Sequence, residues 1–213
     1  MSAVQNHMSA LPSADAERSA VRYVERAARA MTLLLTGKLV VGGRETLCRV
    51  RNMSATGMMI ETHMALSKGD EVRVDLRSTS NLSARVVWTR EGAAGLAFHV
   101  PVDLKAVLAG ETSRSRILRA RVPRAPRLAA ECPITVAAGG APQEASLLDI
   151  SQSGARLRLP FRPAREERLV LTIPGLPVKS GAVRWVRDAE AGLAFYMPLP
   201  FDLLAEWIEQ RGS

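Results

Sequence analysis

The chain has 213 residues, of which 47% are hydrophobic and 23% charged, and its formal net charge is +8. This composition is typical of a globular protein with one or two domains and argues against disorder throughout. No apolar run approaches the roughly 20 residues of a membrane-spanning helix, and the N-terminal residues lack the order of a signal peptide. We therefore expect a cytoplasmic protein without membrane insertion.

Residues 1–24 are polar and rich in alanine and serine, and we expect an N-terminal extension that is first disordered and then helical. The helix would begin near Ser13, a residue type that caps helices, and run toward Met31. Such a helix would place Arg22, Arg26 and Arg29 on one face, because residues four and seven positions apart are neighbours there.

The next stretch, residues 25–112, has the pattern of a β domain. In "EVRVDL", Val72 and Val74 alternate with Arg73 and Asp75, as in a strand with one buried face. Turn residues such as "GG" at 42 separate the short strands. This pattern favours an antiparallel barrel or a sandwich, ended by a short helix.

A basic linker is expected at residues 113–122. The stretch from Arg114 to Arg127 carries six arginines and no acidic residue, which favours an anionic partner. A basic nucleic-acid binder is one interpretation, but only 4% of residues are aromatic and no reading-helix motif is present. We expect no sequence-specific nucleic-acid binding.

Residues 123–213 repeat the first domain. The phrase "WTREGAAGLAFHVP" at Trp88 returns as "WVRDAEAGLAFYMP" at Trp185, 97 positions later, and the same offset aligns Ser54 with Ser151. A tandem domain duplication explains this match. The second copy ends in an amphipathic helix, "FDLLAEWIEQ".

Catalytic and metal-binding motifs are not found in the sequence. The three histidines are scattered, and no serine lies in a nucleophile elbow. Cys48 and Cys132 lie in apolar runs without a CxxC spacing, so they are interpreted as buried thiols. The sequence predicts a protein that is not an enzyme and that has no metal or cofactor.

Two polar turns remain, "NMSATG" with Asn52 and "DISQSG" with Asp149, and each follows a pair of arginines by 22 or 23 residues. In both copies the polar turn is followed along the chain by a V-x-W strand and a "GLAF" strand. With this order of motifs, both copies resemble the PilZ domain, a bacterial receptor module for cyclic di-GMP. The resemblance implies a mainly β fold: two tandem six-stranded antiparallel barrels, each with a short C-terminal helix, plus the N-terminal helix. It also implies a downstream protein partner and a change in the arrangement of the barrels when ligand binds.

The chemistry of the motif suits such a ligand. An arginine fork matches both a phosphate and the O6/N7 edge of guanine, and Asp or Asn can accept hydrogen bonds from a base. The glycines are expected to supply positive φ and to let the backbone approach closely. The ligand-binding candidates are Arg121, Arg124, Arg127, Asp149, Ser151 and Gly154 in the second copy, and Arg22, Arg26, Arg29, Asn52, Ser54 and Gly57 in the first.

Several alternatives stay open. Trp88 and Trp185 either stack on a guanine or lie in the core, and the turn residues either bind ligand or only stabilise their turns. The family's first arginine is replaced by Glu25 and Pro123, so a ligand-independent adapter is the alternative to a receptor. Because an Asp carboxylate can accept two hydrogen bonds from guanine, the second copy is expected to bind more tightly than the first.

Overall fold

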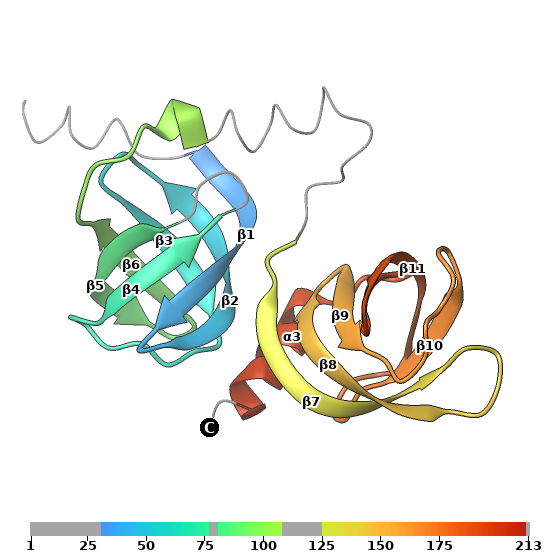
Figure 1. The fold of residues 1–213 in the computed structure, drawn as a ribbon. Helices are drawn as coiled ribbons and strands as arrows, with labels where there is room; N and C mark the ends of the chain where they lie inside the picture. The colour runs from blue at the N-terminus through green and yellow to red at the C-terminus, as the bar shows by residue number, and fades with distance from the viewer. Residues whose placement is uncertain (1–30, 77–80, 108–124, 212–213) are drawn as a thin grey trace, which may run out of the picture.

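The computed structural model describes residues 31–76, 81–107 and 125–211. The expected extension and basic linker lie outside these ranges, as do Arg22, Arg26, Arg29, Arg121 and Arg124. Two closed six-stranded antiparallel barrels follow one another along the chain (Figure 1), so the barrel, not the sandwich, is confirmed.

The first barrel is formed by β1 (Met31–Val41), β2 (Arg44–Met53), β3 (Gly57–Thr62), β4 (Glu71–Asp75), β5 (Leu82–Arg90) and β6 (Ala93–Phe98). Its strands pair in the order β1, β2, β3, β6, β5, β4. Residues 104–107 are helical, and the chain beyond them is outside the described ranges. The Asp103 carboxylate accepts from the backbone N–H of Lys105 and so caps this turn.

The second barrel repeats this order with β7 (Leu128–Ala137), β8 (Gln143–Ser151), β9 (Gly154–Arg158), β12 (Glu190–Phe195), β11 (Lys179–Arg187) and β10 (Arg168–Thr172). The duplication extends to individual hydrogen bonds. The Phe98 N–H donates to the Thr56 oxygen at 2.9 Å, and 97 positions later the Phe195 N–H donates to Ser153 at 2.9 Å. Both copies therefore fold by the same strand pairings.

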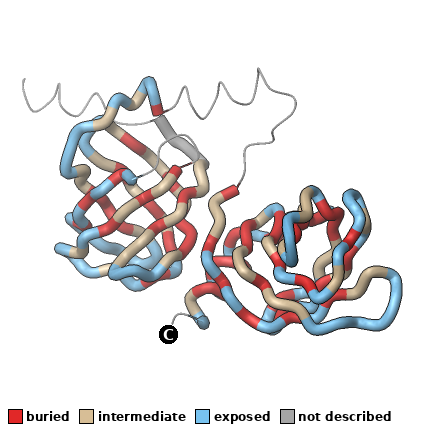
Figure 2. The backbone as a smooth tube through the Cα atoms, viewed as in Figure 1, coloured by how far each residue is buried: buried red, intermediate tan, exposed pale blue. Residues whose placement is uncertain are grey.

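Strand alternation places the two cores as expected. In β4 Val72 and Val74 are buried, in β9 Ala155 and Leu157 are buried, and the arginine between each pair is half-buried. Figure 2 shows buried and less buried stretches alternating along the strands of both barrels. Each barrel encloses its own apolar cluster, and Cys48 and Cys132 are free thiols inside them. Burial raises the pKa of Cys48 to about 12, so this thiol stays protonated at neutral pH.

The helix α3 (Phe201–Arg211) closes one end of the second barrel. Its Leu204, Trp207 and Ile208 are buried, and the Trp207 indole N–H donates to the Pro174 carbonyl at 2.7 Å. Leu203, expected on the same face, is only half-buried. The apolar face predicted from the sequence thus packs on the barrel that precedes it.

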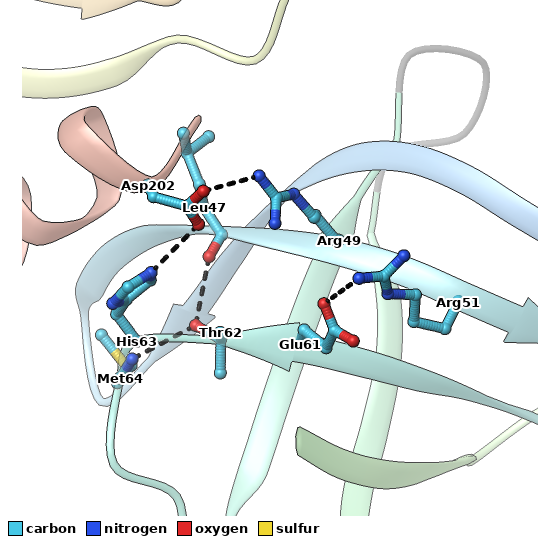
Figure 3. A network of polar contacts seen from close by, with 8 residues as sticks. All are labelled: Leu47, Arg49, Arg51, Glu61, Thr62, His63, Met64 and Asp202. Atoms are coloured by element: carbon cyan, nitrogen blue, oxygen red, sulfur yellow. Dashed lines mark hydrogen bonds and ion pairs between the residues drawn. The ribbon is translucent and has the colours of Figure 1, made fainter. Parts of the chain in front are cut away.

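The two barrels contact one another through β2 on one side and α3 and β7 on the other (Figure 1). Arg49 donates to Asp202 at 3.0 Å and lies 4.0 Å from the ring centre of Phe201, and His63 reaches the same carboxylate (Figure 3). Partial burial raises the pKa of Asp202, but the hydrogen bonds from Arg49 and His63 outweigh it and lower the pKa overall. Leu47 on β2 is fully buried in the second barrel's core cluster.

Candidate functional site

The β8–β9 turn carries the motif DISQSG and is held by its own serine. The buried Ser151 hydroxyl donates to the Gly154 carbonyl at 3.1 Å, and in the first barrel Ser54 donates to Gly57 at 3.3 Å. Both serines therefore close their turns, as ST turns do. A contact with ligand remains a prediction for them.

Gly154 and Gly57 are required for a different reason than positive φ. Neither is among the described glycines with positive φ, so that expectation is wrong. A Cβ at Gly154 would overlap the carbonyl oxygen of Leu193 on β12, and one at Gly57 would overlap Leu96. A close approach of this backbone to a ligand stays a prediction; the close approach that the structure shows is between neighbouring strands.

Asp149 lies between two arginines on the outside of the second barrel. Its Oδ1 pairs with Arg127, just before β7, and its Oδ2 lies 2.8 Å from Nε of Arg156 on β9. The carboxylate is 15% exposed, whereas the arginines are 35% and 43% exposed. The cluster has two cations around one anion, and both guanidinium groups keep N–H donors toward solvent.

A row of paired residues continues from this cluster across the barrel. These residues are partners in the strand register: Asp149 on β8 lies opposite Arg156 on β9, Arg156 lies opposite Gly192 on β12, and Gly192 lies opposite Trp185 on β11. We call these four residues the outer row of the second barrel. The Trp185 indole occupies the space that a side chain at Gly192 would fill, so the ring lies on the sheet surface over the residue that pairs with Arg156.

Both tryptophans lie outside the cores, which contradicts the core alternative. Trp185 is half-buried and Trp88 is 37% exposed. A register shift between Val183 and Trp185, repeated between Val86 and Trp88, turns the indole outward where strict alternation would place it inside. Each ring is therefore accessible to a stacking partner on the barrel surface.

The first barrel builds the same row with other chemistry: Asn52, Met59, Gly95 and Trp88. Among the residues that the structure describes, the Asn52 amide makes a weak contact, 4.0 Å, to the sulfur of Met59. Where the second barrel has Asp149 and Arg156, the first has no charge. Its nearest ion pair, Arg51 with Glu61 at 2.6 Å, lies beside the row.

The arginine motifs also differ in register. Ala129 pairs with Asp149 and, at the same offset, Thr32 pairs with Asn52. The counterpart of Arg127 is therefore Ala30, and Arg29 is shifted by one residue. The structure brings together Arg127 and Asp149 of the predicted site, with Ser151 and Gly154 in the adjoining turn.

Sequence reasoning missed Arg156 and Glu190. Arg156 also lies 3.6 Å from Glu190 on β12, and Arg158 lies 3.8 Å from the same carboxylate. The signal available in the sequence is that Arg156 alternates with the apolar Ala155 and Leu157 directly after Gly154, which predicts an outward side chain but not its partner. Its approach to Asp149 depends on the pairing of β8 with β9.

The PilZ domain model matches the chain over residues 17–110 and 121–210. The chain belongs to the PilZ domain family. Each matched stretch contains one barrel, so this is a tandem PilZ protein. No match was found among curated proteins.

Solved structures similar to this PilZ protein include the Borreliella burgdorferi PlzA protein in complex with cyclic di-GMP, at 13% identity and a TM-score of 0.38, with 90% of this chain and 98% of that chain covered. The Bacillus subtilis inhibitor of motility MotI (DgrA) shares 13% identity at a TM-score of 0.34, covering 85% and 98%. The complex of K. pneumonia MrkH with cyclic di-GMP shares 13% identity at a TM-score of 0.32, covering 91% and 89%.

Across residues 31–76, 81–107 and 125–211, no three His, Cys, Asp or Glu side chains gather in a way that could hold a metal ion. Within the same part of the chain, no helix has the length and apolar character needed to cross a membrane.

Proposed function

We propose that this PilZ protein is a cytoplasmic, non-catalytic receptor for cyclic di-GMP that binds ligand on the second barrel and signals to a protein partner. The observation that carries the proposal is the position of Arg127 and Arg156 on either side of Asp149, with Trp185 at the other end of the same row. This surface combines phosphate-binding, base-binding and stacking groups.

Each part of the ligand has a partner in this surface. Cyclic di-GMP presents two phosphates and two guanines, and the arginine forks can bind either group with two parallel hydrogen bonds. A phosphate that takes the Arg127 guanidinium frees Asp149 to accept from N1–H and N2–H of a guanine. The ion pairs hold these groups in place before ligand arrives, which lowers the cost of ordering them.

The output of the receptor is proposed to travel along β7. Ala129, two residues after Arg127, donates its backbone N–H to Glu45 of the first barrel at 3.1 Å. Burial raises the pKa of Glu45, but hydrogen bonds from Lys38 and Ala129 outweigh it, so the pKa is lowered and the carboxylate stays charged. A ligand that moves the start of β7 therefore acts directly on a contact between the barrels.

Small-angle scattering tests this output. We expect the radius of gyration and the scattering profile to change at saturating cyclic di-GMP, because the ligand alters the contact between Ala129 and Glu45. Glu45→Gln, which keeps the shape of the side chain but removes its charge, is expected to shift the ligand-free profile toward the bound one. Identical profiles with and without ligand would contradict the proposed rearrangement.

The alternative is a ligand-independent adapter, in which the barrels serve only as docking surfaces for another protein. The uncharged outer row of the first barrel favours this role for that barrel. Calorimetric titration with cyclic di-GMP separates the two proposals. We expect one tight site per chain, whereas no heat and no thermal shift would leave only the adapter.

A further inference from the structure

We infer that Arg156 is a third arginine of the ligand site and determines its preference for guanine. The inference rests on the proposed function and concerns a residue outside the arginine pair and the polar turn. Arg156 lies in the middle of the outer row, paired with Asp149 on one side and with Gly192 on the other. It thus lies between the carboxylate and the glycine that the Trp185 indole covers.

The Arg156 side chain is fixed in position but still open to a ligand. Its Nε lies 2.8 Å from Asp149 and its Nη1 lies 3.6 Å from Glu190, so two carboxylates orient the guanidinium. The side chain nonetheless remains 43% exposed. Its buried Nε makes no well-directed hydrogen bond despite the short ion-pair distance, so the contact with Asp149 does not use up the donors of this guanidinium.

The indole of Trp185 determines which part of the ligand reaches Arg156. Because the ring covers Gly192, a base stacked on it extends over β12 toward β9, where Arg156 is the paired residue. An arginine fork beside a stacked base matches the O6 and N7 acceptors of guanine. Adenine presents an amino group at that edge, so the same fork disfavours it.

The neighbouring Arg158 provides a matched control on the same strand. It also points outward and lies 3.8 Å from Glu190, but its paired residues are Ser146 and Glu190, one step away from the outer row. It carries the same charge as Arg156 without the contact to Asp149. Methionine is the natural replacement to test at Arg156, because Met59 occupies the equivalent position in the first barrel.

The test is calorimetric titration of the full chain with cyclic di-GMP and with cyclic di-AMP. For Arg156→Met we expect cyclic di-GMP affinity to fall by about 10- to 100-fold, the worth of one bidentate base contact, and the preference over cyclic di-AMP to shrink. Arg156→Lys should lose most of the same affinity, because an ammonium lacks the fork. Arg158→Met should stay within about threefold of wild type.

The outcomes separate this inference from the proposed function. If wild type binds and Arg156→Met binds equally well, Arg156 is not a ligand contact, although the receptor proposal stands. If Arg156→Lys keeps the affinity of wild type, or if Arg158→Met loses as much affinity as Arg156→Met, charge alone explains the effect and the assignment to guanine is overturned. If wild type does not bind at all, the receptor proposal fails and the inference fails with it.

Discussion

Replacing Arg127 or Asp149 with alanine is expected to weaken cyclic di-GMP binding by about 100-fold or more. Each hydrogen bond to a charged group is worth about 1.5–3 kcal/mol, and each substitution removes a group able to make two. Asp149→Ala also leaves Arg127 and Arg156 without the carboxylate between them, so two like charges face each other. Calorimetric titration of folded protein measures the change.

The matched controls lie in the first barrel. Asn52→Ala removes the residue equivalent to Asp149, and Arg29→Ala removes the arginine nearest in sequence to the position of Arg127. Both variants are expected to leave the tighter site within about threefold of wild type, because the first outer row has no charged residue. A larger loss from the first-barrel changes than from Arg127→Ala would reverse the assignment of the site.

The sequence predicted the barrels because their signals are local and repeated. Alternation around Val72 identified a strand, the repeat transferred the pattern to the second copy, and the turn glycines separated the strands. The position of the indoles was harder to predict, because strict alternation from the buried Val183 would put Trp185 inside the barrel. Only a register shift turns it outward, and that shift depends on pairing with β12.

The candidate site could be predicted only in part, for a similar reason. Arg127 and Asp149 are separated by 22 positions and were matched through the order of the motif. Arg156 meets Asp149 across the β8–β9 pairing, and Glu190 meets Arg156 across the β9–β12 pairing. A local sequence pattern does not predict either contact. Gly154 was recognised, but its role in strand packing could not be distinguished from a role in a turn.

Local sequence patterns also did not predict the contact between the barrels. The apolar face of α3 was visible in the sequence, whereas the partner of Asp202 on its exposed face was not. Exposed ion pairs of this kind are each worth about 1 kcal/mol or less. The ion pairs in this contact are therefore weak enough for a ligand at the start of β7 to shift them, and the buried Leu47 forms the apolar part of the same contact.

Gly154→Ala is expected to destabilise the second barrel by about 3 kcal/mol, the largest effect on folding that we predict for one methyl group. The new Cβ would overlap the Leu193 carbonyl, which is backbone inside the β9–β12 pairing. A flexible side chain could turn away, but this oxygen can move only if the two strands separate. For a domain of this size, the change corresponds to a fall in Tm of about 10 °C or more.

Calorimetry on two further glycine variants decides whether the overlap is the cause. Gly57→Ala creates the same overlap with Leu96 in the first barrel, so it should lower the Tm of that barrel and leave ligand affinity nearly unchanged. Gly140→Ala adds a methyl group where no atom lies within 4 Å, so stability should stay within about 0.5 kcal/mol of wild type. If Gly154→Ala melts like Gly140→Ala, β9 and β12 are not as close as the structure places them, and the outer row that depends on their pairing would not form as described.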